Sequence, residues 1–223
     1  MDVADKDSIH TVMVVGSGSM GRGIILSFAM AGFNTIVLTR DPTHLSDLPQ
    51  DVTARQELPE ESPDLIIEAI PEKMELKEAL FERLEQTYGD TPILASNTSS
   101  LPLDKIADGL KNPGRFIGIH YMHPAESLPM VEVIRVSQTS DHTLSRVKAA
   151  LKKTGKESIV LKKPIVGFLI NRLQHALLHE AYYLIEEGIV EAKDIDDFAK
   201  WDANRLSSTR NLAREFAHSW VSD

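Results

Sequence analysis

Three glycines near the amino terminus have the spacing that phosphate binding requires. Gly16, Gly18 and Gly21 form a G-x-G-x-x-G pattern in VMVVGSGSMGRGI, after an apolar run and at the start of an expected helix. In such a turn the first glycine permits a tight bend, the second leaves room for a pyrophosphate, and the third lets the helix approach the strand. The pattern predicts a dinucleotide site that also uses Ser19 and Met20. A plain turn with packing glycines is the alternative.

The end of the next apolar run, NTIVLTR, would face the ribose of this dinucleotide. An acidic residue there suits the 2′-hydroxyl of NAD, whereas an arginine suits the 2′-phosphate of NADP. Thr39 occupies the expected acidic position and Arg40 follows it. We therefore expect NADP to be slightly favoured, with Arg40 pairing with the phosphate. The alternative is NAD, served by Asp41 after a small shift of the loop.

The elements that would position these residues alternate between short apolar strands and helices. Residues 11–15 and 34–40 flank a helix closed by Gly32, which makes a βαβ unit. Between residues 41 and 63 we expect a loop or short helix, with a short strand near 51–55. Further strands are expected at 64–70, 92–99, 115–124, 130–136 and 157–162, and helices at 72–88, 102–110 and 141–155. This order predicts an α/β fold, a Rossmann-like doubly wound and mainly parallel sheet.

The pattern changes near residue 164. Residues 167–188 predict one long helix with an apolar stripe, and residues 192–201 predict a short helix. We therefore expect a flexible tail at 1–9, a dinucleotide-binding domain at 10–163 and a small all-helical domain at 164–223.

Composition excludes several classes of protein. The chain has 223 residues, a net charge of −9 and no cysteine. The negative charge argues against nucleic acid and anionic membranes as partners, because both attract clustered Lys and Arg. The acidic start does not have the form of a signal peptide, and no apolar run approaches the length of a membrane span. A cytoplasmic protein is expected.

Four further motifs follow the glycines in order: EAIPEKMELK, SNTSSL, GIHYMHPAESLPMVEVI and VGFLINRLQ. Together these motifs, over residues 11 to about 200, resemble the 3-hydroxyacyl-CoA dehydrogenase family, including relatives that oxidise L-gulonate or carnitine. The resemblance implies an oxidoreductase of fatty acid metabolism. It would transfer a hydride between NAD(P) and the 3-hydroxy/3-oxo carbon of a 3-hydroxyacyl-CoA or 3-hydroxy acid. The resemblance also implies that the helical domain helps to bind substrate and forms a homodimer.

The resemblance further assigns roles to individual residues. His120 and Glu132 match the family's catalytic pair, while Ser99 and Asn171 match the residues that hold the reacting oxygen. The chemistry agrees, because histidine exchanges protons near neutral pH and a carboxylate on its other nitrogen fixes its tautomer. Three more positions would lie on the cofactor side: Glu72, Lys77 and Asn97. An exposed helix pair is the alternative for the first two.

The chain also departs from the family pattern. His123 stands where the family usually has asparagine. The segment between Arg40 and Asp64 is too short for the helical hairpin that helps the family to bind coenzyme A. The helical domain is short for the family, and residues 202–223 match no motif of it.

Single features of the sequence also suggest three other functions. His175 and His179 lie four apart on the expected long helix, with Glu180 next, and this spacing could bind a metal, but no third ligand is evident, so no metal is expected. A hydrolase triad of Ser99, His120 and Glu132 would need a G-x-S-x-G elbow that the sequence lacks. A non-catalytic NAD(P)-binding redox sensor or interaction module remains the alternative to an enzyme.

Overall fold

The computed structural model describes residues 7–45 and 48–206. The chain divides into two compact units, Met1–Leu169 and Ile170–Asp223. The tail expected at residues 1–9 includes Ile9, which is buried in the core of the first unit. Residues 1–6, 46–47 and 207–223 lie outside the described residues.

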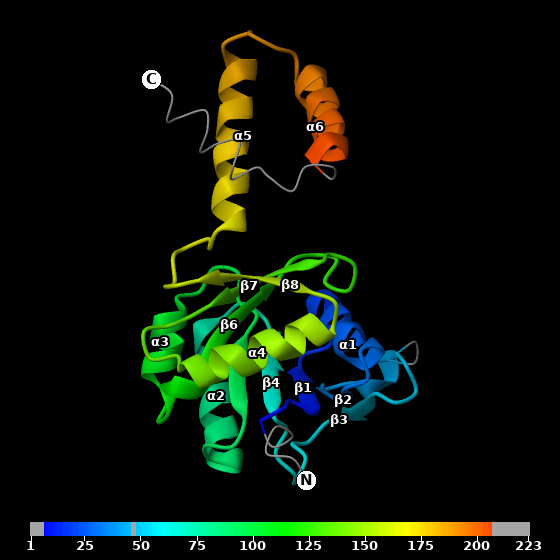
Figure 1. The fold of residues 1–223 in the computed structure, drawn as a ribbon, viewed down its shortest axis with the longest axis vertical. Coiled ribbons are helices and arrows are strands. Elements are labelled where there is room, and N and C mark those ends of the chain that lie inside the picture. Colours follow the sequence, from blue (N-terminus) through cyan, green and yellow to red (C-terminus); the bar gives the residue numbers. More distant parts are fainter. Residues whose placement is uncertain (1–6, 46–47, 207–223) are drawn as a thin grey trace. The chain divides into compact units, whose positions relative to one another are not determined.

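The first unit is built on one sheet (Figure 1). Its eight strands run in the order β3-β2-β1-β4-β5-β6-β7-β8. They are β1 (Thr11–Val15), β2 (Asn34–Leu38), β3 (Thr53–Arg55), β4 (Leu65–Glu68), β5 (Ile93–Ser96), β6 (Phe116–Tyr121), β7 (Met130–Ile134) and β8 (Glu157–Leu161). Every pairing is parallel except that of β6 with β7. The predicted doubly wound, mainly parallel sheet is confirmed.

Helices cover both faces of this sheet (Figure 1). On one face, Val12 and Val14 of β1 share a core with α1 (Ser19–Met30) and α4 (Asp141–Lys153). On the other face, Met13 and Val15 share a core with α2 (Met74–Tyr88) and α3 (Leu103–Asp108). Successive side chains of a strand point to opposite faces, so a strand buried on both faces reads as a continuous apolar run. This is why TVMVV has no polar residue after its first position.

Strand order changes direction beside β1. The chain runs from β1 outward through β2 to β3, and then returns to β4 on the other side of β1. In sheets of this kind ligands bind in the crevice outside the carboxyl ends of the strands at that switch point. The glycine turn follows β1 there, and Glu68 and Ser96 end β4 and β5 at the same edge.

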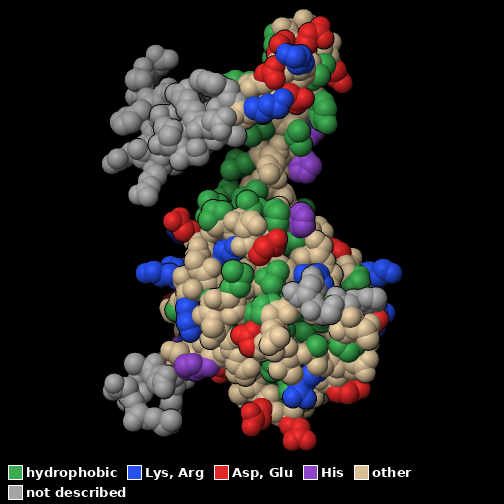
Figure 2. Space-filling view, turned by 90° about the vertical axis from the view of Figure 1, so that its right-hand side faces the viewer, with side chains coloured by type: hydrophobic (Ala, Val, Ile, Leu, Met, Phe, Trp, Pro, Cys, Tyr) green, Lys and Arg blue, Asp and Glu red, His purple; other side chains and the backbone are tan. Residues whose placement is uncertain are grey.

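The segment between β2 and β4 contains a short 3-10 helix, η2 (Pro42–Leu45), and the three-residue β3. Both agree with the sequence expectation for this segment. A second 3-10 turn, η3 (Pro113–Arg115), leads into β6. On the face of the first unit drawn in Figure 2, acidic and basic side chains are interspersed rather than gathered by sign.

The second unit holds α5 (Ile170–Glu186) and α6 (Ala192–Leu206). The long helix was expected from residue 167, but it begins at Ile170. Gly167 and Phe168 have φ angles of 76° and 46°, and this left-handed backbone is incompatible with a right-handed helix. Several large apolar side chains of α5 are exposed, namely Leu173, Leu177, Leu178, Tyr182 and Tyr183.

Candidate active site

The glycine turn has the geometry that its sequence predicts. Gly16 has a φ of 109°, and a Cβ there would lie 2.5 Å from the carbonyl oxygen of Ala69. A Cβ on Gly21 would collide with the carbonyl group of Gly16. Gly18 caps α1 with an extended backbone, and a Cβ built on it would meet nothing within 4 Å. The turn therefore has no room for a side chain at Gly16 and Gly21, whereas Gly18 borders open space. This arrangement fits a pyrophosphate that lies against the start of α1.

Residues beside this turn include two expected cofactor contacts. Ser19 is the first residue of α1, and its hydroxyl lies 3.3 Å from Nδ1 of His123. Met20 packs against the core beneath the turn. His123, which stands where the family usually has asparagine, thus lies beside the start of α1. The sequence did not indicate this position.

The end of β2 carries the residues expected to read the ribose. The Thr39 and Ser17 hydroxyls are 2.7 Å apart, which ties the end of β2 to the glycine turn. Arg40 is exposed, and its carbonyl oxygen accepts a hydrogen bond from Gln56. Asp41 accepts bonds from the amide and hydroxyl of Thr43 through one oxygen, Oδ1. That carboxylate oxygen is used to start η2.

His120 and Glu132 lie directly opposite each other on the antiparallel strands β6 and β7. Nδ1 of His120 is 2.7 Å from Oε2 of Glu132. The other carboxylate oxygen accepts a bond from the backbone N–H of Leu169 at 2.8 Å. His120 is 5% exposed and Glu132 is fully buried. An ionised carboxylate requires Nδ1 to be the protonated nitrogen, so Nε2 is left to exchange a proton.

Phe168 packs against His120 near the end of the first unit. Its ring centroid lies 5.2 Å from that of His120, and its side chain is 2% exposed. Sequence analysis missed this residue, because a phenylalanine at the expected start of a helix gives no sign of a left-handed backbone.

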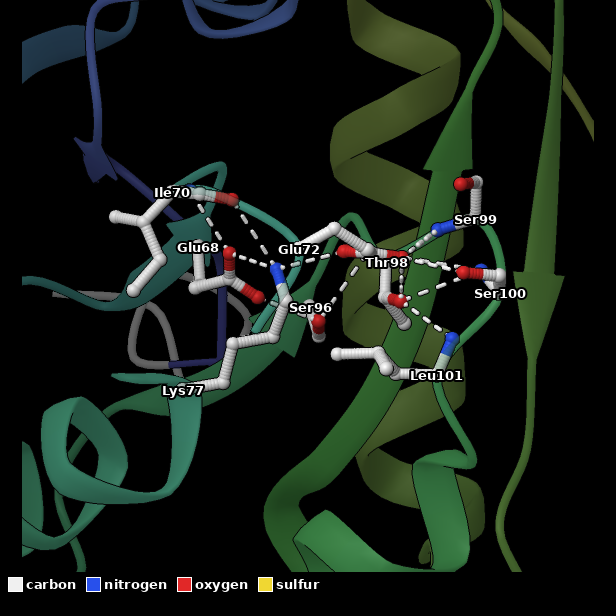
Figure 3. Close-up of polar contacts among 9 residues, drawn as sticks. All are labelled: Glu68, Ile70, Glu72, Lys77, Ser96, Thr98, Ser99, Ser100 and Leu101. Carbon is white, nitrogen blue, oxygen red and sulfur yellow. Dashed lines mark hydrogen bonds and ion pairs between the residues drawn. The ribbon is translucent and has the colours of Figure 1, made fainter. Parts of the chain in front are cut away.

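A network of charges joins β4, α2 and the turn after β5 (Figure 3). Lys77 is 1% exposed, so the alternative of an exposed helix pair is wrong for this residue, whereas Glu72 is exposed and precedes α2. The Lys77 ammonium contacts Glu68 at 2.5 Å and Glu72 at 3.1 Å. Sequence analysis singled out Glu72 and Lys77 but missed Glu68. The available signal was one acidic residue at the carboxyl end of an otherwise apolar strand, DLIIEAI.

Glu72 is a fixed anion. Burial raises the pKa of its carboxyl group, but the hydrogen bond from Thr98 and the charge and hydrogen bond of Lys77 outweigh this and lower the pKa to about 2. Its Oε1 accepts from the Thr98 hydroxyl, the Ser99 amide and the Ser100 amide. The carboxylate thereby holds the turn that contains Ser99.

The same turn is tied to the end of β6. Oδ1 of Asn97 accepts a bond of 2.9 Å from the amide of Tyr121, the residue after His120. Ser99 is exposed on this turn. Asn171 belongs to the second unit, where it is the second residue of α5. Its place beside the other residues therefore stays a prediction.

Comparisons with known proteins decide the family. The model described as 3-hydroxyacyl-CoA dehydrogenase, NAD binding domain, matches residues 11–62 and 52–164. The model of the C-terminal domain of 3-hydroxyacyl-CoA dehydrogenase matches residues 167–218. The chain belongs to the 3-hydroxyacyl-CoA dehydrogenase family. The second match includes most of the segment 202–223, for which sequence analysis recognised no family motif.

Individual relatives and solved structures support the same family. The chain is 34% identical to a probable 3-hydroxybutyryl-CoA dehydrogenase from Deinococcus radiodurans, over 90% of this chain and 81% of that protein. The solved structure of (S)-3-hydroxybutyryl-CoA dehydrogenase from Ralstonia eutropha has a TM-score of 0.78 and 29% identity, and the match covers 88% and 78% of the two chains. An NAD⁺-dependent 5-formyl-3-hydroxy-2-methylpyridine 4-carboxylic acid 5-dehydrogenase has a TM-score of 0.84 and 25% identity, over 95% and 76%.

The predicted reaction class is confirmed by this membership: the chain is an NAD(P)-dependent dehydrogenase of the hydroxyacyl type. Among the described residues, no helix is both long and apolar enough to cross a membrane. No group of three or more His, Asp or Glu side chains in the described ranges is gathered as a metal site would need.

Proposed function

We propose that His120 is the proton-transfer residue of an oxidation at C3 of a 3-hydroxyacyl thioester, and that Glu132 orients it. The supporting observation is the buried contact of 2.7 Å between Nδ1 of His120 and the Glu132 carboxylate. In the oxidising direction, Nε2 takes the substrate's hydroxyl proton while the hydride leaves C3. Glu132 stabilises the imidazolium that results. The nicotinamide ring supplies the hydride acceptor, and reduction is the same step in reverse.

Ser99 and Asn171 are proposed to hold the reacting oxygen. A hydroxyl and an amide donor stabilise negative charge that develops on that oxygen during the transfer. Support for Ser99 comes from its turn, which follows β5 and is bonded through Asn97 to the end of β6 beside His120. The cofactor would lie across the glycine turn, with Asn97, Glu72 and Lys77 toward its nicotinamide end.

We propose that the part of the site that faces the ribose, at the end of β2, favours NADP over NAD. Arg40 is exposed beside Thr39, and no carboxylate occupies the end of β2 itself. We expect Arg40→Ala to weaken NADPH binding by about 10-fold, since a lost charge-assisted pair costs about 1.5 kcal/mol. NADH affinity should not change. Fluorescence titration of both reduced cofactors measures this. Equal losses for NADH and NADPH, or no loss, would overturn the preference.

The substrate is proposed to be a short 3-hydroxyacyl thioester. The name of the Deinococcus radiodurans relative favours a coenzyme A ester. A free 3-hydroxy acid is the other candidate, because the segment between β2 and β4 has no helical hairpin among its described residues. Oxidation assays with 3-hydroxybutyryl-CoA and 3-hydroxybutyrate, each with NAD and NADP, separate the two. We expect turnover with the thioester only. Tight cofactor binding without turnover on either would instead favour a sensor.

We also propose that the second unit forms a homodimer. The apolar side chains along α5 carry the support: Leu173, Leu177 and Tyr182 are 58%, 73% and 60% exposed. Exposed apolar surface of this extent on one helix is typical of a contact with another chain.

A further inference from the structure

Glu68 is a buried carboxylate to which the proposed reaction gives no part. It ends β4, the strand beside β1, and its side chain is 0% exposed. Its Oε1 accepts from the amide of Ile70 at 2.8 Å, and its Oε2 accepts from the hydroxyl of Ser96 at 2.6 Å. A buried charge is costly unless it is paired and hydrogen-bonded, so a carboxylate kept here needs a partner of opposite charge.

Lys77 is that partner, and it has three acceptors. Its ammonium donates to Glu68 at 2.5 Å and to the carbonyl oxygen of Ile70 at 3.3 Å, and it lies 3.1 Å from Oε2 of Glu72. An ammonium has three protons, so these contacts use all of them. Lys77 is therefore held in one place between two carboxylates, as Figure 3 shows.

Glu72 links Lys77 to the turn after β5. Its Oε1 accepts from the amides of Ser99 and Ser100 at 3.0 and 3.1 Å, and also from the Thr98 hydroxyl. An oxygen with this many donors has little capacity left for a further ligand. Glu68 reaches the turn by a second route, because the Ser96 hydroxyl that it binds also accepts from the Thr98 amide at 3.2 Å.

We propose that Glu68 is a positioning residue for the reaction: through Lys77 and Glu72, and directly through Ser96, it fixes the turn that presents Ser99 to the substrate. The proposal rests on the function proposed for Ser99. It also makes Glu72 and Lys77 more important for the geometry of this turn than for the affinity of the cofactor.

Glu68→Gln tests this with the least change of shape. The amide oxygen can still accept from the Ile70 amide. The amide NH2 can only donate to the Ser96 oxygen, which reverses the wild-type bond, and the charge that holds Lys77 is lost. We expect kcat/KM for the thioester to fall by about 10- to 100-fold, since small displacements of a positioning group have effects of this size. NADH affinity, measured by fluorescence titration, should stay at the wild-type value.

Glu85→Gln is the matched control. Glu85 lies on α2, as Lys77 does, and forms another buried ion pair, with Arg115 at 2.9 Å. Both variants should lower the temperature of thermal unfolding, but only Glu68→Gln should lower kcat/KM. Equal effects of the two on kcat/KM would overturn the proposal and leave Glu68 a structural residue. A loss of NADH affinity that accounts for the whole fall in kcat/KM would also overturn it.

Ser96→Ala provides a second measurement that does not depend on the folding of the charge variant. It removes the direct link from Glu68 and leaves the ion pair intact. We expect a smaller fall in kcat/KM, again at unchanged NADH affinity, and wild-type kinetics in both Ser96→Ala and Glu68→Gln would contradict the proposal. If the wild-type protein itself shows no turnover, the proposed function fails instead, so the two failures are distinguishable.

Discussion

Gly16 and Gly18 have different physical reasons to be glycine, although the sequence pattern treats them alike. Gly16 has a positive φ and a carbonyl group in the place of a Cβ, whereas Gly18 borders open space. We expect Gly16→Ala to lower the free energy of unfolding by roughly 1–3 kcal/mol, the range for a strained backbone. Gly18→Ala should unfold at the wild-type temperature but bind NADH at least about 10-fold more weakly, which is about 1.4 kcal/mol.

Thermal unfolding and fluorescence titration of the two variants check this separation. A Gly18→Ala protein that binds NADH as tightly as wild type would show that the pyrophosphate does not lie over this glycine.

Single residues also mark the limit of what the sequence could predict. His120 and Glu132 were predictable as partners because each lies on an apolar strand and the strands are consecutive. Glu68 was not, since one carboxylate at the end of a buried strand does not reveal a lysine nine positions later on a helix. Its role depends on the tertiary contact with Lys77.

At the scale of elements, α5 shows why a boundary is harder to predict than a helix. Its apolar spacing predicted the helix, but the left-handed backbone at Gly167 and Phe168 delays its start to Ile170. Phe168 is thereby part of the first unit's core and contacts the His120 ring. Periodicity describes the body of a helix, whereas its first residue is set by local backbone geometry.

Helix α5 is also where the proposed homodimer can be tested. A charge at Leu177, which is 73% exposed, should be harmless in a monomer but should separate a dimer that buries it. We expect Leu177→Glu to shift the mass measured by light scattering from that of two chains to that of one. His175→Glu adds the same charge about 200° around the helix and should leave the mass unchanged. A wild-type protein with the mass of one chain would contradict the proposed dimer.

At the scale of the whole molecule, one reversal of strand direction assembles the site. The segment 122–129 between β6 and β7 is shorter than the dozen or more residues that a parallel crossover needs. The two strands therefore pair antiparallel, and His120 faces Glu132 across them. The alternation of strands and helices predicted the mainly parallel sheet, but the register that sets these two side chains opposite each other emerges only from the pairing.

The most direct test of the account is single-turnover oxidation of NADH or NADPH by acetoacetyl-CoA in wild type and His120→Gln. His142→Gln serves as control, because His142 is exposed and lies near Asp7. The account predicts that His120→Gln slows the reaction by about 10²- to 10⁴-fold, the contribution of a general acid, while cofactor affinity is retained. A His120→Gln protein that reacts at the wild-type rate would contradict the assignment of proton transfer to this imidazole.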